Sequence, residues 1–135
     1  MDKISYAVNE IDKVISDNKV QLEGKYEKIE YNHQEGYIYL KCFIAHNQWR
    51  ELSVGIDPLG PPPKFYTGLE RQKRGGTKRE IEDWENYQAK KQRIQETDGL
   101  IIKFKFHENG KTWEIAPTYH YSGTNFLEQF KSHFL

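Results

Sequence analysis

The Asn109-Gly110 pair, set between two runs of alternating apolar residues, constrains the fold more than any other feature of this chain. An Asn-Gly pair adopts the positive φ angles of a two-residue hairpin turn at low cost. In the register that this turn sets, the facing pairs are Glu108 with Lys111, Phe106 with Trp113, Phe104 with Ile115, Ile102 with Pro117, and Leu100 with Tyr119. The alternative register would bury Lys103 and Lys105, so the apolar face favours the first. The chain is therefore expected to contain an antiparallel sheet.

The first half of the chain predicts one helix followed by three strands. Residues 2–17 carry apolar side chains at helical spacing, namely Ile4, Val8, Ile11 and Ile15. Strands are expected at 21–32, 37–45 and 49–56, and they form an antiparallel meander. Residues 37–45 are apolar at nearly every position, which predicts a central strand covered on both faces. In 49–56, Leu52, Val54 and Ile56 are expected to face the core.

A long Pro/Gly-rich connection, residues 57–76, follows the third strand. Connections longer than about 12–15 residues without regular structure are usually functional or disordered. The sequence Thr77-Lys-Arg-Glu80 reads as a capping box, so we expect a second long helix from there to about residue 96. A short amphipathic helix is expected after Ser122-Gly-Thr-Asn125, with Phe126, Leu127, Phe130 and Phe134 covering the core.

These elements predict a single α+β domain over residues 1–135, in the order α-β-β-β-α-β-β-α. The sheet is antiparallel with about five strands, and the helices lie mainly on one face. A length of 135 residues suits one domain. The order of elements resembles, in topology alone, that of type III secretion chaperones and other small α+β binding modules. Similarity of fold does not by itself carry function.

Composition and charge indicate a cytoplasmic protein. Cys42 is the single cysteine, so no disulfide forms within the chain, which favours a reducing compartment. The first 20 residues lack the apolar stretch of a signal peptide, and nowhere do about 20 apolar residues follow one another. We therefore expect no membrane insertion. Lysine outnumbers arginine fifteen to five, which points to an AT-rich, bacterial or phage genome.

The sequence predicts neither an enzyme nor a metal or cofactor site. No phosphate-binding loop, nucleophile elbow or zinc-protease motif is present. The five histidines, at positions 33, 46, 107, 120 and 133, lack the spacing of metal ligands, and the hairpin register places His107 opposite Thr112. Cys42 sits in the most apolar strand, so it is expected to be a core residue and not a nucleophile.

The segment 64–79 is the most unusual stretch of the chain. It holds six basic residues against Glu70 alone, a local charge of +5 in a chain whose formal net charge is zero. The candidate binding residues here are Phe65, Tyr66, Arg71, Lys73, Arg74, Lys78 and Arg79. Such a segment could be a solvated loop, could bind an acidic protein, or could meet phosphates while its aromatic rings stack on bases.

Aromatic residues outside the expected core give the second candidate surface. Tyr37 and Tyr39 stand on the outer side of a strand, where tyrosines are either covered by a helix or presented to a partner. We therefore expect a non-enzymatic protein-binding module: a small adaptor, a chaperone, or an inhibitor such as an immunity or counter-defence protein. The partner would be another protein, an acidic one or a second copy in a homodimer. The alternative is a nucleic-acid-binding protein that uses the basic segment 64–79.

Overall fold

The structure is a computed structural model that describes residues 3–57, 59–60 and 78–135. Its elements, in chain order, are α1 (Lys3–Asp17), α2 (Lys19–Lys25), β1 (Lys28–Gln34), β2 (Tyr37–Ala45), β3 (Gln48–Ile56), α4 (Lys78–Thr97), β4 (Leu100–Glu108), β5 (Lys111–Glu114) and α5 (Gly123–Phe134). The five strands form one antiparallel sheet in the order β1-β2-β3-β4-β5. The expected α+β fold, with its order of elements, is confirmed.

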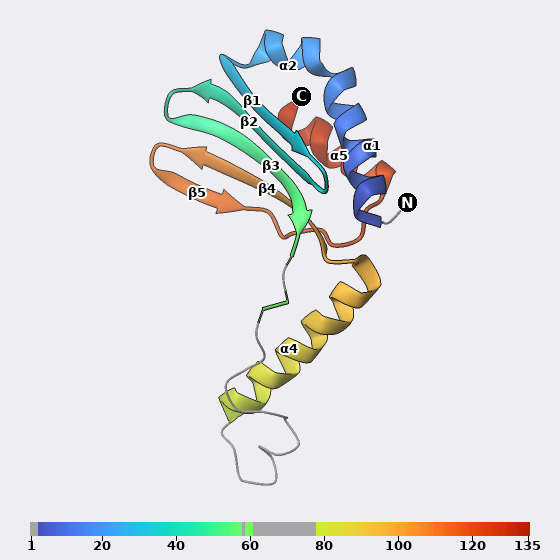
Figure 1. Ribbon diagram of the computed structural model, residues 1–135. Coiled ribbons are helices and arrows are strands. Elements are labelled where there is room, and N and C mark those ends of the chain that lie inside the picture. The colour runs from blue at the N-terminus through green and yellow to red at the C-terminus, as the bar shows by residue number, and fades with distance from the viewer. Residues whose placement is uncertain (1–2, 58, 61–77) are drawn as a thin grey trace.

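Helices α1 and α5 lie side by side on one face of the sheet, and α2 continues from α1 toward the edge of the sheet (Figure 1). Helix α4 instead projects from the end of the sheet and leaves the body of the protein. It is inserted between β3 and β4, which pair with each other from Gln48↔Glu108 to Ile56↔Leu100. The helices therefore cover mainly one face, as the sequence predicts.

The core lies between that face and the helices. Alternate residues of the central strands point into it, and they are buried: Ile38, Leu40 and Cys42 of β2, Leu52 and Val54 of β3, and Leu100, Ile102 and Phe104 of β4. Helix α1 contributes Ile4, Ala7, Val8, Ile11 and Ile15. Helix α5 contributes Phe126, Phe130 and Phe134, whose rings stack along the helix. Both helices carry the expected apolar spacing.

The hairpin has the predicted register near its turn but not far from it. Asn109 and Gly110 have φ values of 50° and 82°, and Phe106 pairs with Trp113. Farther out, Ile102 pairs with Thr118, so the expected pairing with Pro117 is wrong by one residue. Proline has no N–H to donate to a ladder, and the backbone of Thr118 makes both hydrogen bonds to Ile102 instead.

The strand expected at 21–32 is wrong in its first half, because α2 occupies Lys19–Lys25 and β1 begins at Lys28. Asn18 ends α1, as expected, and its side chain donates to the carbonyl of Val14. The chain then resumes a helix made largely of good helix formers, Lys, Gln, Leu and Glu. Leu22 is buried, and the hydroxyl of Tyr26 donates to the Phe134 carbonyl, so this turn closes one end of the core.

Two expectations about burial are also wrong. Strand β2 is covered on one face only: Ile38, Leu40 and Cys42 are buried, but Tyr37 on the other face is exposed. The side chains on its second face instead pack against side chains of the neighbouring strands. Ile56, expected to face the core, is 62% exposed because it ends β3 at the end of the sheet from which α4 departs.

The core position of Phe130 gives the first prediction. Its ring is fully buried between Phe126 and Phe134, so Phe130→Ala should lower the free energy of unfolding by about 3–5 kcal/mol. Urea denaturation followed by circular dichroism measures this loss. Val20→Ala is the control: Val20 is 83% exposed, so its change should stay within about 0.5 kcal/mol. Equal losses in the two variants would contradict the proposed core.

Candidate binding surface

The face of the sheet opposite α1 and α5 carries no described helix (Figure 1). We call it the open face, and it is formed by the residues that alternate with the core positions. They are Lys28, Glu30, Asn32 and Gln34 of β1; Tyr37, Tyr39, Lys41 and Phe43 of β2; Trp49, Glu51, Ser53 and Gly55 of β3; Ile101, Lys103, Lys105 and His107 of β4; and Thr112 and Glu114 of β5. Strand alternation alone places these side chains together.

An aromatic row crosses the open face. The strand register aligns Phe43, Trp49 and His107 on three adjacent strands. The ring centroids of Trp49 and His107 are 3.8 Å apart at an interplanar angle of 11°, and those of Phe43 and Trp49 are 5.5 Å apart. The ammonium of Lys41 lies 4.2 Å from the Trp49 ring centroid, and His107 Nδ1 lies 2.8 Å from Thr112 Oγ1. These contacts hold the row as one ordered apolar strip.

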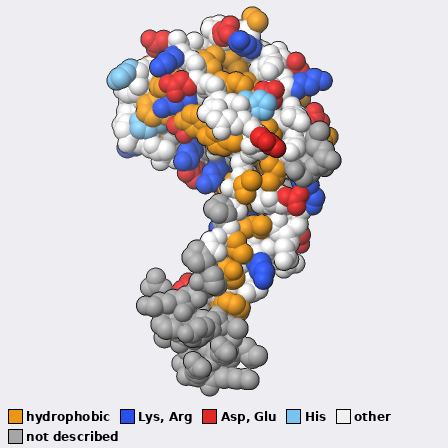
Figure 2. Space-filling view, viewed as in Figure 1, with side chains coloured by type: hydrophobic (Ala, Val, Ile, Leu, Met, Phe, Trp, Pro, Cys, Tyr) orange, Lys and Arg blue, Asp and Glu red, His pale blue; other side chains and the backbone are white. Residues whose placement is uncertain are grey.

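A row of alternating charge runs beside the aromatic row. Its members are adjacent in register on all five strands: Glu30, Lys41, Glu51, Lys105 and Glu114. Opposite charges on neighbouring strands attract, so the row supports the sheet on the face that lacks helices. Lys105 Nζ lies 3.2 Å from Glu114 Oε1. In the view of Figure 2, basic and acidic side chains are interspersed with hydrophobic ones over the body.

Glu51 links the charged row to both tyrosine and tryptophan. Its Oε1 accepts a hydrogen bond of 2.9 Å from Trp49 Nε1. Burial, followed by the nearby Glu51 carboxylate and its hydrogen bond, raises the pKa of Tyr39 above its ordinary value. Tyr39 therefore stays protonated. Of the two tyrosines named from the sequence, Tyr39 is half-buried in this network, whereas Tyr37 is exposed and lies against Gly55.

The basic segment is only partly within the described residues. Phe65, Tyr66, Arg71, Lys73 and Arg74 lie outside them, and so does the side chain of Arg79. Lys78 is the first residue of α4; it is exposed, and its Nζ lies 4.0 Å from Glu82 Oε1. The structure thus brings Tyr37 and Tyr39 into one surface. It joins them with Phe43, Lys41 and His107, which sequence reasoning missed, because strand parity gives the face of each residue but only the register of three strands brings them together.

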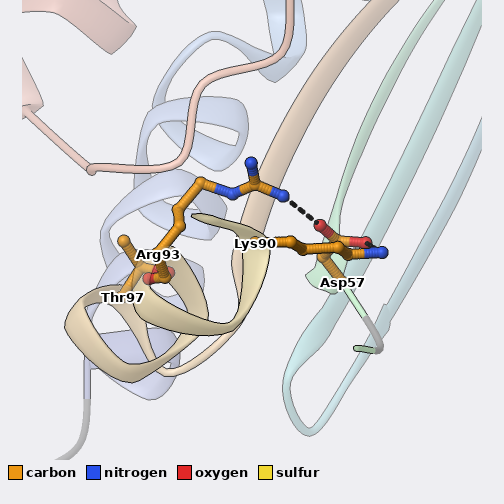
Figure 3. A network of polar contacts seen from close by, with 4 residues as sticks. All are labelled: Asp57, Lys90, Arg93 and Thr97. Atoms are coloured by element: carbon orange, nitrogen blue, oxygen red, sulfur yellow. Dashed lines mark hydrogen bonds and ion pairs between the residues drawn. The ribbon is translucent and has the colours of Figure 1, made fainter. Parts of the chain in front are cut away.

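A cluster around Asp57 fixes the root of α4 (Figure 3). Asp57 follows β3, and its carboxylate lies 3.4 Å from Lys90 Nζ and 3.1 Å from Arg93 Nη2. The guanidinium of Arg93 also stacks on the Tyr119 ring, 3.9 Å from its centroid. The hydroxyl of Thr97 donates to the Arg93 carbonyl, one turn earlier in the helix. One carboxylate thus binds two cations of the projecting helix.

A backbone hydrogen bond also joins the two chain segments at this end of α4. The N–H of Asp57 donates to the carbonyl of Gly99 at 2.6 Å, where the chain returns to the sheet. Gly99 has a φ of 83°, and a Cβ there would lie 3.2 Å from the Ile56 side chain. Only glycine fits this position without strain. The two ends of the insertion are therefore held side by side.

The structure also answers the remaining questions that the sequence raised about Cys42, His107, metal ligands and membrane spans. Cys42 is fully buried, which confirms its role in the core, and burial raises the pKa of its thiol to about 12. His107 contacts Thr112, as the hairpin register predicts. Within residues 3–57, 59–60 and 78–135, no cluster of three or more metal-binding side chains is found. In the same residues, no helix has the length and apolar character to cross a membrane.

Comparisons with models of known protein families, with curated proteins and with solved structures give no match for this chain. Three properties of the open face stand out: an aromatic row, an alternating charged row and the absence of a described helix above either of them.

The ion pairs of Asp57 predict how firmly the C-terminal turns of α4 are attached to the body of the protein. Asp57→Asn removes the charge that binds Lys90 and Arg93, so the last turns of α4 should lose about 1–2 kcal/mol of protection against local opening. Hydrogen–deuterium exchange over residues 90–97 measures this. Lys78→Gln, which breaks only the exposed contact with Glu82, is the control and should leave exchange there unchanged. Unaltered exchange in Asp57→Asn would contradict the role of the cluster.

The burial of Cys42 predicts its reactivity. At pH 8 the thiol is protonated, because its pKa is about 12, and it is inaccessible to reagent. Ellman's reagent should react with one thiol per chain in 6 M guanidinium and with almost none in native buffer over the same time. Fast stoichiometric reaction of the native protein would show that β2 is not packed as described.

Proposed function

We propose that this chain is a non-enzymatic protein-binding module that docks a partner protein on the open face. The observation that carries the proposal is the aromatic row of Phe43, Trp49 and His107, which no described helix covers and in which Trp49 and His107 stack. Aromatic side chains are enriched at protein interfaces, where they bury much area at low entropic cost. Tyr37 and Tyr39 extend the same surface.

The charged row supports a protein partner over a nucleic acid. A sheet that stacks bases needs positive charge for the phosphates beside its aromatic rings. Here Glu30, Glu51 and Glu114 alternate with the lysines, so a phosphate backbone would meet repulsion on every second strand. A protein surface can match alternating signs, and such matching fixes its orientation. A small adaptor, chaperone or inhibitor acting in the cytoplasm is the class of protein we propose.

The experiment uses two tyrosines of similar exposure on opposite faces of neighbouring strands. Tyr37 on the open face is 37% exposed, and Tyr31 on the other face is 40% exposed. Each is replaced in turn by the photoreactive p-benzoylphenylalanine, and the full chain is irradiated in source cells. We expect a discrete protein adduct from position 37 and at least fivefold less from position 31, as judged by denaturing electrophoresis and mass spectrometry.

Three other outcomes are informative. An adduct between two copies of the chain would support the open face as a protein interface and would identify its occupant as a second copy. A nuclease-sensitive adduct would overturn the proposal in favour of a nucleic-acid-binding protein. Equal adducts from positions 31 and 37 would show that the open face has no special role, and the proposal would fail.

A further inference from the structure

The carboxylates of the open face are already engaged within the chain. Glu30 pairs with Lys28 at 3.2 Å, Glu114 pairs with Lys105 at 3.2 Å, and Glu51 accepts from Trp49. Forming an interface desolvates these groups, but each keeps a partner while it does so. The glutamates therefore call for no new cation from an incoming protein.

Two lysines of the same face differ from these. Lys41 and Lys103 make no direct ion pair with any of the described residues, although both are half-buried on the sheet and Lys41 lies in register between Glu30 and Glu51. The Lys41 ammonium lies over the rings of Phe43 and Trp49, at 4.8 and 4.2 Å from their centroids. Covering an ammonium without giving it a carboxylate would be costly, because a buried charge needs a partner.

The register fixes how far apart these lysines stand. Lys41 of β2 lies opposite Glu51, and Lys103 of β4 lies opposite Ser53, two residues along the same strand. Two strand spacings and two residue rises separate them, which gives about 12 Å between their Cα atoms. The line between them crosses β3 between Glu51 and Ser53, and the aromatic row lies next to Lys41 on the side away from Lys103.

We infer that the partner of the open face presents two carboxylates, one to Lys41 and one to Lys103, whose Cα atoms lie about 12 Å apart, beside apolar side chains that cover the aromatic row. This inference rests on the proposed function and specifies its partner: a protein surface that is acidic at two points and apolar next to the point that meets Lys41. Complementary charge of this kind steers association and sets the register of docking.

Carbodiimide coupling tests the contact directly, because it joins a lysine amine to a carboxylate that touches it. The full chain, in extract of source cells, is treated with a water-soluble carbodiimide, and the linked peptides are sequenced by mass spectrometry. We expect Lys41 and Lys103 to be linked to Asp or Glu of a second protein. Lys105 provides an internal control, since it should be linked to Glu114 of its own chain, 3.2 Å away.

Charge reversal supplies the second test of this inference. The double variant Lys41→Glu/Lys103→Glu should reduce the photo-adduct from position 37 by about tenfold or more, whereas Lys41→Arg/Lys103→Arg should retain it. Lys91→Glu, on an exposed position of α4, is the matched control and should leave the adduct unchanged. Thermal unfolding of each variant by circular dichroism identifies a loss that comes from misfolding, and Lys41→Gln/Lys103→Gln replaces a variant that fails to fold.

The proposed function and the proposed acidic partner are overturned by different results. A wild-type chain that gives no protein adduct at position 37 would overturn the proposed function. An adduct that forms in the wild type and survives charge reversal, with no linkage from Lys41 or Lys103 to a foreign carboxylate, would overturn only the acidic partner.

Discussion

The packing of two helices against a single face of the sheet is the constraint on which the rest of the structure depends. Helix α5 supplies a stripe of phenylalanines, α1 supplies aliphatic side chains, and together they satisfy the apolar residues of the central strands. A sheet needs only one buried face to be stable, so long as it is antiparallel. The arrangement leaves its second face without a described helix above it, and that face is where we propose that a partner docks.

The open face replaces helical cover with contacts that run sideways between strands. Rings from β2, β3 and β4 pack against one another, and Lys105 of β4 forms an ion pair with Glu114 of β5. Such contacts are individually worth about 0.2–1 kcal/mol, so they order the surface without making it a second core. An ordered surface loses little entropy on binding, which is the property that an interface requires.

How much of this could be predicted from the sequence depended on how local each signal is. The Asn109-Gly110 turn and the stripes of α1 and α5 depend on neighbours within a few residues, and these elements were predicted correctly. The surroundings of β2 were not, because apolar spacing shows that a face is apolar but not whether a helix or a neighbouring strand covers it. The aromatic row needed the register of three strands, which no single segment contains.

The hydrogen bond between Asp57 and Gly99 has a meaning for the architecture as a whole. Strand β3 ends there and strand β4 begins beside it. A tight turn could therefore join the two strands, and the five-stranded meander would be complete. Helix α4 is thus inserted between two strands that already pair with each other. Such an insertion can change in length or sequence at little cost to the sheet, and the two parts of the protein can evolve separately.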